Sequence, residues 1–349
     1  MSDAAFRAPN AIDREDRARA PVEPRTGFAF GKVILLGEHA VVYGAPALAP
    51  GIDRGARAIV TPLVPPSAST LVLGGRTVVA DAEAADDLAR ALAALLAEGE
   101  PAGSVAVEAF TDLPPGGGLG CSAALAVAIA RAVEPAGPHA EAAVLKRSTA
   151  WERIFHGNPS GIDTAAAARG GCLRFSRTEG VRPIEPAKDF WLCIGSSGPG
   201  ASTRTMVEQV AKLHARKPEM VQKSVDGVTS LVDNAALAVE AGDLTALGRL
   251  MDLNQMILAG LMVSTESIEQ MCGIARSEGA LGAKLTGAGG GGSVIALVPS
   301  ACAGAEHVSE PEVAEAARRI LEAWRVKGFG GFVARVQARN PSLPRKEQP

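Results

Sequence analysis

Alternation of hydrophobic and polar positions predicts strands in both halves of the chain. Val105 to Phe110 alternates and is rich in Val and Phe, which favours a half-buried strand. Short apolar or alternating runs predict further strands at 33–36, 56–63, 70–73, 77–80, 172–176, 191–195 and 331–336, and a strand, glycine loop and strand over 283–297. Gly74-Gly75-Arg76 is typical of a hairpin turn between two of these strands.

Helical segments separate these strands. The run after the central glycine-rich stretch is rich in Ala and Leu, which predicts a helix that begins at about Leu119 and continues to Val133. Periodicity and composition predict other helices at about 86–96, 139–155, 203–216, 219–240, 244–260, 265–278 and 311–325. This combination of predicted strands and helices indicates an α+β fold.

A lapse in periodicity at 177–188 divides the chain into two predicted domains, residues 27–185 and 186–339. Residues 1–26 are charged and irregular, a pattern that predicts a mobile leader. The polar residues 340–349 are predicted to form a C-terminal tail. The length of 349 residues agrees with two domains, and 47% hydrophobic with 21% charged residues is enough for a full core.

Charge and cysteine content exclude several classes of protein. A net charge of −3 gives no electrostatic footprint for nucleic acid or an anionic membrane. Five scattered cysteines without a CxxC pair argue against structural zinc or a disulfide framework and predict a cytoplasmic protein. The two long uncharged runs, 113–130 and 285–305, contain many glycines and at least one proline each, so neither is a membrane helix.

The glycine-rich stretch Asp112–Ala124 predicts an anion site. It joins a strand to a helix and has four glycines in the five positions 116–120. Glycines let backbone N–H groups approach a ligand, and a helix start adds unpaired donors and partial positive charge. A glycine-rich turn without a ligand is the alternative, and the absence of Gly-Lys-Ser/Thr excludes the Walker arrangement.

A second glycine-rich stretch lies at Lys284–Ser293. Gly287, Gly289 and Gly292 fit the GxGxxG spacing, but a strand and not a helix follows, so a dinucleotide site is rejected. A glycine loop between two strands can still pass close to a ligand or another loop.

Individual polar residues leave two interpretations open. Lys32 precedes an apolar strand and Glu152 lies on a predicted helix, and the residues alone favour exposure to solvent for each of them over a functional role. Ser122 fits an ordinary first-turn residue, and Asp163 fits an N-cap of the alanine-rich segment after it. His39 and His156 fit hydrogen-bonded structural histidines. The histidines and cysteines have no metal-ligand spacing, and no Gly-x-Ser-x-Gly elbow suggests a hydrolase.

Four motifs, in order, resemble those of the GHMP small-molecule kinases. They are Gly31–Gly44 (GKVILLGEHAVVYG), Pro114–Ala124 (PPGGGLGCSAA), Glu152–Asp163 (ERIFHGNPSGID) and Lys284–Ser293 (KLTGAGGGGS). The first and third of these are closest to the mevalonate kinase branch of the family. Cys121 replaces a serine that is usual there, and Phe30 replaces a proline.

The resemblance implies a two-domain GHMP-kinase fold with an N-terminal mixed-sheet ATP-loop domain and a C-terminal ferredoxin-like domain. It also implies roles for individual residues. Ser122 and Glu152 would hold Mg²⁺, Asp163 would accept a proton from the reacting hydroxyl, and Lys32 would stabilise charge beside it. The residues implied to form the ATP loop are Pro115, Gly116, Gly117, Gly118, Leu119, Gly120, Cys121, Ser122 and Ala123. The residues implied to contact the substrate are Glu38, His39, Asp163 and Thr203. A second glycine loop is implied to lie near the site, with Gly287, Ala288, Gly289 and Gly290. His156 is interpreted as structural.

The implied activity is transfer of the ATP γ-phosphate to the 5-hydroxyl of mevalonate, with Mg²⁺ as cofactor. Another GHMP kinase, acting on phosphomevalonate or a sugar, remains an alternative, as does a non-catalytic ATP-binding sensor on the same fold. The expected partners are ATP and mevalonate, without nucleic acid or membrane, and a homodimer is left open.

Overall fold

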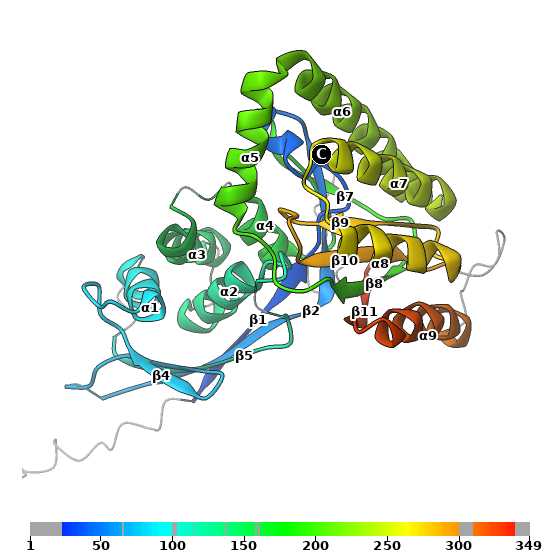
Figure 1. Cartoon of the computed structure of the whole chain (residues 1–349). Coiled ribbons are helices and arrows are strands. Elements are labelled where there is room, and N and C mark those ends of the chain that lie inside the picture. The colour runs from blue at the N-terminus through cyan, green and yellow to red at the C-terminus, as the bar shows by residue number, and fades with distance from the viewer. Residues whose placement is uncertain are drawn as a thin grey trace, which may run out of the picture.

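The computed structural model describes residues 23–64, 66–99, 103–114, 116–135, 137, 139–157, 159, 161–299 and 310–338. Within these residues the molecule is built on a seven-stranded and a four-stranded sheet (Figure 1). The strands are β1 (Arg25–Lys32), β2 (Ala47–Pro62), β3 (Thr70–Leu73), β4 (Arg76–Val79), β5 (Val105–Thr111), β6 (Cys172–Ser176), β7 (Gly180–Ile184), β8 (Phe190–Ser196), β9 (Gly282–Thr286), β10 (Ser293–Leu297) and β11 (Gly330–Val336). The helices are η1 (Ala40–Tyr43), α1 (Asp87–Ala97), α2 (Cys121–Val133), α3 (Ala140–His156), α4 (Ile162–Arg169), α5 (Thr203–Arg216), α6 (Pro218–Ala241), α7 (Leu244–Gly260), α8 (Glu266–Ser277) and α9 (Glu310–Val326).

The larger sheet has the strand order β4-β3-β5-β2-β6-β7, with β1 paired to β2. The long strand β2 connects its two parts, because residues 56–62 pair with β5 and residues 47–50 pair with β6. Helices α2 and α4 pack on one face, and α3 packs on α2 (Figure 1). A Cβ atom on Gly27 would lie 2.0 Å from the Ala128 carbonyl oxygen, so glycine there permits the close approach of β1 to α2.

The smaller sheet has the order β11-β8-β10-β9 with antiparallel pairing throughout. Its chain order of strand, helices, two strands, helix and strand gives the ferredoxin-like topology. Helices α8 and α9 pack on this sheet and α7 packs on β9 (Figure 1). The predicted α+β fold with a ferredoxin-like second part is therefore confirmed.

Some predicted elements are wrong in position. The segment 33–36 is not a separate strand: β1 ends at Lys32, and the residues after it follow β2 through Val33 N–H to Pro50 O (3.1 Å) and Leu35 N–H to Leu48 O (2.8 Å). The register of β1 on β2 shifts at Phe30/Gly31, which interrupts regular pairing. Strand β7 lies inside the 177–188 segment that was predicted to lack regular structure, and α4 was not predicted as a helix.

The predicted ends of the chain are tested in part. Strand β1 begins at Arg25, so the last two residues of the predicted leader (1–26) belong to the sheet. Residues 1–22 and the predicted tail lie outside the described residues. The domain boundary at 185/186 stays a prediction; the two sheets are separated in sequence by residues 185–189.

The fold brings the four motif segments together. The end of β1, the start of α2, the start of α4 and the β9–β10 loop meet where the two sheets adjoin. In the described part of the chain, no helix is both long enough and apolar enough to cross a lipid bilayer.

Candidate active site

A cleft of about 370 Å³ lies where the four motif segments meet. Its walls come from both sheets and from the helices α2, α3, α4 and α5. The lining includes Lys32, Glu38, His39, Gly116–Ala123, Glu152, His156, Asp163, Thr203 and Gly287–Gly289. The cleft therefore gathers most of the residues that the sequence singled out, from positions more than 250 residues apart.

The first glycine loop and α2 form a ready anion site. Gly116, Gly118 and Gly120 have φ angles of 72°, 73° and 71°, in the left-handed region that favours glycine. Gly120 is the N-cap of α2 and supplies no side-chain acceptor, so the first N–H groups of this 13-residue helix remain available to an anion. Pro115, predicted to belong to this loop, lies outside the described residues.

Lys32 and Asp163 form an ion pair in the cleft. The Lys32 Nζ lies 3.1 Å from Asp163 Oδ1 and donates to the Gly118 carbonyl oxygen at 3.1 Å. Lys32 is 4% exposed, so its interpretation as a solvated lysine is wrong. Asp163 does not cap α4, because Gly161 is the N-cap and Asp163 lies in the first turn. Both side chains instead meet beside the glycine loop.

Ser122 and Glu152 form a second polar pair. The Ser122 hydroxyl donates to Glu152 Oε1 at 2.5 Å and accepts from Trp151 Nε1 at 3.2 Å. Glu152 is 2% exposed, so it is not a solvated helix residue. Burial raises the pKa of the Glu152 carboxyl, and the hydrogen bond from Ser122 opposes that rise.

Glu38 and His39 occupy the turn before η1 and are both tied to the β9–β10 segment. The buried Glu38 carboxylate pairs with Lys284 Nζ, and its Oε2 has no hydrogen-bond partner in the described residues. His39 Nε2 lies 2.7 Å from the Ala288 carbonyl oxygen, which can only accept, so this nitrogen is the donor. Burial lowers the pKa of the His39 imidazole. Burial raises the pKa of the Glu38 carboxyl, and the nearby Lys284 ammonium opposes that rise. His39 is therefore a neutral group at this wall.

The second glycine loop packs on the first. Ser293 Oγ donates to the Gly117 carbonyl oxygen at 2.7 Å, and a Cβ on Gly118 would lie 3.4 Å from the Gly287 Cα. The Thr286 hydroxyl also accepts from Ile34 N–H at 2.8 Å. The loop predicted at Gly287–Gly290 thus lies against the anion site. Thr203, at the start of α5, lines the cleft and is exposed.

Cys121 begins α2 at the position of the family serine. It is half-buried, and its Sγ lies 3.7 Å from Thr111 Oγ1. Burial raises the pKa of the thiol, and the charges of Asp112 and Glu152 raise it further. The positive end of the helix therefore does not make Cys121 a low-pKa thiolate.

The oxygen donors of Ser122 and Glu152 suit a hard cation such as Mg²⁺. Among the described residues, no group of three or more His, Cys, Asp or Glu side chains converges into a complete metal site. A single carboxylate with a hydroxyl beside an anion site fits the way Mg²⁺ is usually held, with substrate phosphates and water completing its shell.

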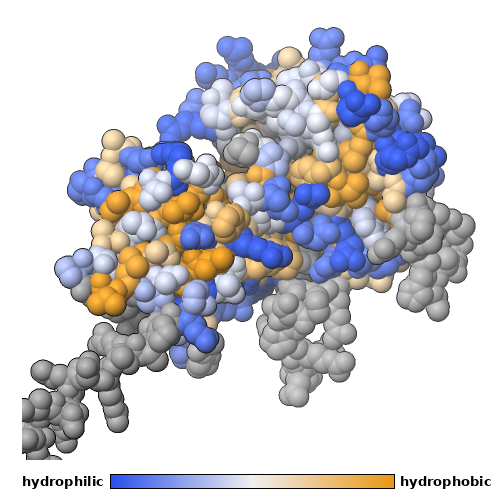
Figure 2. Space-filling model, turned by 90° about the horizontal axis from the view of Figure 1, so that it is seen from below, coloured by the Kyte–Doolittle hydropathy of each residue, from blue (hydrophilic) through white to orange (hydrophobic). Residues whose placement is uncertain are grey.

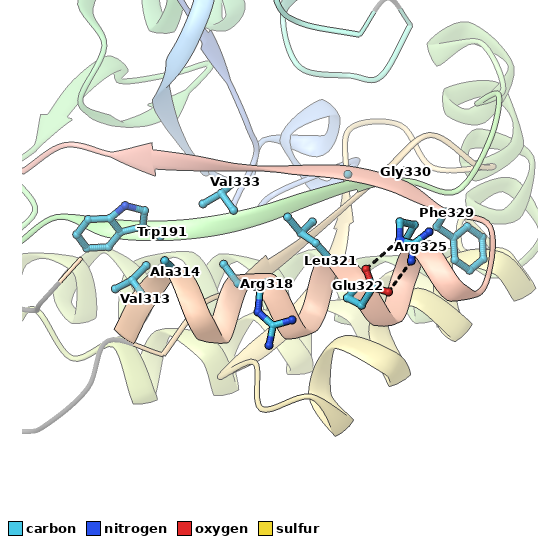
Figure 3. Close-up of a pocket in the computed structure, with 12 residues that line it drawn as sticks. Trp191, Val313, Ala314, Arg318, Leu321, Glu322, Arg325, Phe329, Gly330 and Val333 are labelled. Carbon is cyan, nitrogen blue, oxygen red and sulfur yellow. Dashed lines mark hydrogen bonds and ion pairs between the residues drawn. The ribbon is translucent and has the colours of Figure 1, made fainter. Parts of the chain in front are cut away.

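A larger hollow of about 620 Å³ lies elsewhere, between α9 and the strands β8 and β11 (Figure 3). Its walls are mostly apolar, with Trp191, Leu321 and Phe329 directed toward it. Arg325, on the rim of this hollow, forms an ion pair with Glu322, which Figure 3 marks with dashed lines. No converging acid, base or anion-binding backbone is found among its lining residues, so the smaller cleft is the candidate active site.

Sequence reasoning missed one polar residue and one aromatic contact at the cleft, and one buried lysine behind its wall. His156, interpreted as structural, lines the cleft with its Nε2 3.7 Å from Glu152 Oε2; the i, i+4 spacing could have revealed this pair. Lys284 is fully buried, and a lone lysine in an apolar strand signals a buried partner. Nothing in the sequence pointed to the contact between Trp151 and Ser122.

Comparison with known families gives a match in each half of the chain. Residues 83–171 match the model described as the GHMP kinases N-terminal domain, and residues 235–326 match the GHMP kinases C-terminal model. Together these ranges cover slightly more than half of the 349 residues.

Curated relatives extend the similarity over most of the chain. The chain is 34% identical over 292 residues to mevalonate kinase of Pyrococcus horikoshii, covering 77% of this chain and 87% of that one. It is 35% identical over 274 residues to mevalonate kinase of Methanothermobacter thermautotrophicus, covering 77% and 88%.

Solved structures give the same picture of the fold. The L. major mevalonate kinase in complex with R-mevalonate has a TM-score of 0.73 and 28% identity, over 90% of this chain and 96% of that chain. The Lactococcus lactis galactokinase complexed with galactose has a TM-score of 0.70 at 18% identity, over 91% and 94%, which is a likeness of fold alone.

Proposed function

The chain belongs to the GHMP kinase family and is an ATP-dependent small-molecule kinase, and from this premise we propose that it transfers the ATP γ-phosphate to the 5-hydroxyl of mevalonate. The observation that carries the proposal is the arrangement in the cleft. The Lys32–Asp163 ion pair and the Ser122–Glu152 pair lie beside the N-terminus of α2. Relatives 34% and 35% identical over most of the chain are mevalonate kinases.

Asp163 accepts the proton of the attacking hydroxyl in this mechanism. Its carboxylate is partly exposed in the cleft, and Lys32 holds it at 3.1 Å. A carboxylate within hydrogen-bond reach of the reacting hydroxyl can act as its general base. Lys32 also stabilises negative charge on the reacting oxygens, since phosphoryl transfer depends mainly on positioning and charge neutralisation.

The glycine loop binds the phosphates of ATP. Backbone N–H groups at the start of α2 donate to them, and the second glycine loop supports the first through Ser293 and Gly117. Ser122 and Glu152 would hold Mg²⁺, which supplies positive charge against the phosphates when it is bound. Burial of Glu152 leaves its carboxyl with few water contacts to lose on binding a cation.

The charge of the cleft favours mevalonate over a phosphorylated acceptor. Among the described lining residues, the basic side chains are Lys32, His39 and His156. Lys32 is engaged by Asp163, and burial lowers the pKa of His39, so little positive charge is free for an acceptor. Mevalonate carries one carboxylate, whereas phosphomevalonate adds a phosphate and needs more cationic partners.

A coupled assay of ADP release tests the proposal with mevalonate, phosphomevalonate, galactose and homoserine as acceptors. We expect turnover with mevalonate and at least about tenfold lower kcat/KM with each of the others, a difference of about 1.4 kcal/mol in transition-state binding. Phosphomevalonate turnover equal to that of mevalonate would contradict the substrate and leave the family unchanged. ATP binding without ADP release for any acceptor would favour the sensor alternative.

A further inference from the structure

Lys284 is a charged residue in an unusual place. It lies in β9, whose five residues are all buried, and its own side chain is fully shielded from solvent. Charged side chains normally stay in contact with water, as do the hydrophilic side chains spread over the face of the molecule in Figure 2. A lysine held inside the molecule therefore needs a partner that compensates its charge.

The partner of Lys284 is Glu38, which belongs to the wall of the cleft. Lys284 Nζ donates to Glu38 Oε1 and to the Leu285 carbonyl oxygen. Glu38 lines the cleft and is 1% exposed, whereas Lys284 lies behind it and is not part of the lining. The lysine can therefore act on the contents of the cleft only through the carboxylate of Glu38.

One oxygen of this carboxylate remains available. Glu38 Oε2 is buried and has no hydrogen-bond partner among the described residues. Leaving a buried acceptor unpaired is costly, because the oxygen has lost its contacts with water. An acceptor oxygen in this position can receive a hydroxyl group of a bound molecule, apart from the hydroxyl that reacts beside Asp163.

The same stretch of the smaller sheet also holds the neighbouring residue of the wall. His39 Nε2 lies 2.7 Å from the carbonyl oxygen of Ala288, four residues after Lys284. His39 has a φ of 60°, which is uncommon for a residue other than glycine and persists only where the surroundings impose it. Two contacts from residues 284–288 therefore fix the turn at Glu38 and His39, so this wall depends on both sheets.

The charge of the wall matters for an anionic acceptor. Without Lys284, the Glu38 carboxylate would present a negative charge to a substrate that carries a carboxylate of its own. Like charges at a buried wall repel each other more strongly than they do in water. With Lys284 behind it, the pair is neutral overall, and Glu38 offers an acceptor oxygen without a net charge.

We propose that Lys284 is a positioning residue for the acceptor, which fixes and neutralises Glu38 so that the cleft admits an anionic hydroxy acid with a second hydroxyl group. The inference rests on the proposed function, because it takes mevalonate, with its 3-hydroxyl and its carboxylate, as the acceptor. Lys284 touches neither mevalonate nor ATP in this arrangement. Its removal should therefore change the selectivity for the charge of the acceptor and leave the binding of ATP unaltered.

The test measures this selectivity as the ratio of kcat/KM for mevalonate to kcat/KM for mevalonamide, in which a neutral amide replaces the carboxylate. Lys284→Met leaves the charge of Glu38 uncompensated, so we expect the ratio to fall by at least about tenfold through a higher KM for mevalonate. Glu38→Gln leaves the charge of Lys284 uncompensated and should raise the ratio by about threefold or more. The double variant Glu38→Gln/Lys284→Met should return the ratio to within about threefold of that of the unaltered chain.

Arg147→Met is the matched control for a loss of stability. It breaks the buried ion pair between Arg147 and Glu134, neither of which lines the cleft. This variant should destabilise the chain without changing the ratio. The KM for ATP should stay within about threefold of its normal value in all four variants.

Failure of this inference and failure of the proposed function give different results. An unaltered chain that does not phosphorylate mevalonate contradicts both. If the unaltered chain does phosphorylate mevalonate, an unchanged ratio in either single variant overturns the inference alone, because Lys284 is then only structural. Shifts of the ratio in the same direction in Lys284→Met and Glu38→Gln overturn it as well, since these variants leave opposite charges. Should Lys284→Met fail to fold, the ratio in Glu38→Gln decides the question by itself.

Discussion

At the scale of single residues, the ion pair between Lys32 and Asp163 is the contact on which the proposed catalytic roles rest. The 3.1 Å contact joins the end of a strand to the first turn of a helix 131 positions later in the chain. Taken alone, each residue fits an ordinary structural role: Lys32 fits a solvated lysine, and Asp163 fits a helix N-cap. Their meeting inside a cleft beside an anion site is what distinguishes a base and its electrostatic partner from a solvated lysine and a helix cap.

Replacing the proposed base gives the first prediction. Asp163→Asn keeps the shape of the side chain but removes its ability to accept a proton. We expect kcat to fall by at least about a hundredfold, with the KM for ATP little changed. Steady-state kinetics of purified protein measure both quantities. Asp233→Asn, which alters an exposed partner of Arg174, is the matched control and should keep normal kcat. Near-normal turnover of the Asp163 variant would remove this residue from the mechanism.

The second prediction concerns the proposed metal ligand. Glu152→Gln keeps an oxygen that accepts from Ser122 but loses the charge that attracts a divalent cation. We expect the Mg²⁺ concentration for half-maximal activity to rise by about tenfold or more, equivalent to about 1.4 kcal/mol. Titration of activity with Mg²⁺ at fixed ATP measures this shift. Glu98→Gln, at an exposed ion pair with Lys146, should leave the Mg²⁺ dependence unchanged. An unaltered Mg²⁺ requirement in the Glu152 variant would argue that the carboxylate is structural.

At the scale of elements, the β9–β10 glycine loop is positioned by backbone contacts that leave no room for side chains at Gly289 and Gly291. A Cβ on Gly289 would lie 2.2 Å from the Val263 carbonyl oxygen, and Gly289 has a φ of 77°. These contacts fix the β9–β10 loop against the turn after α7. Gly118 and Gly287 also lie in van der Waals range of each other, so the two glycine loops pack directly together.

The third prediction follows from this packing. Gly289→Ala is expected to lower the free energy of unfolding by about 2–5 kcal/mol, since it adds an overpacked contact to the cost of a left-handed backbone. Gly74→Ala is the matched control, because Gly74 also has a positive φ (57°) but has open space around its Cβ position. Its loss should be only about 1–2 kcal/mol. Denaturant unfolding of both variants measures the difference, and equal losses would mean that the close contact with Val263 has no energetic effect.

Sequence patterns predicted elements well where burial is regular and poorly where it is not. Strand β5 and helices α5 to α8 have clear periodicity, and their predicted bounds agree with the structure within a few residues. Strand β7 (GVRPI) was missed because an edge strand can carry Pro183 and exposed polar residues, which weakens alternation. Helix α4 has only eight residues, too few for a periodic signal.

The site was predictable in its motifs but not in its contacts. The glycine spacing of both loops and the acidic residues on α3 and α4 could be recognised in the sequence. The pairing of Ser122 with Glu152, or of Glu38 with Lys284, depends on distances across the fold that no local pattern encodes. For the same reason His156 was interpreted as a structural residue, although the fold places it in the cleft.

At the scale of the whole molecule, the Glu38–Lys284 pair connects the two sheets. Glu38 follows the segment that continues from β1, whereas Lys284 lies in the middle of β9, and both side chains are almost fully buried. Lys284 Nζ donates also to the Leu285 carbonyl oxygen at 2.5 Å. Taking two charges out of water is costly, and their attraction offsets that cost only while both are present.

The last prediction tests this connection by removing one charge and then both. Lys284→Met keeps much of the volume but leaves the Glu38 carboxylate buried without a counter-charge, so we expect a loss of about 3–5 kcal/mol in the free energy of unfolding. The double variant Glu38→Gln/Lys284→Met has no unpaired charge and should recover at least about half of that loss. Lys146→Met, which breaks an exposed pair with Glu98, should cost no more than about 1 kcal/mol. Denaturant unfolding at a single pH measures all three variants. If the double variant is no more stable than Lys284→Met alone, the loss comes from packing around β9 and not from an uncompensated charge between the sheets.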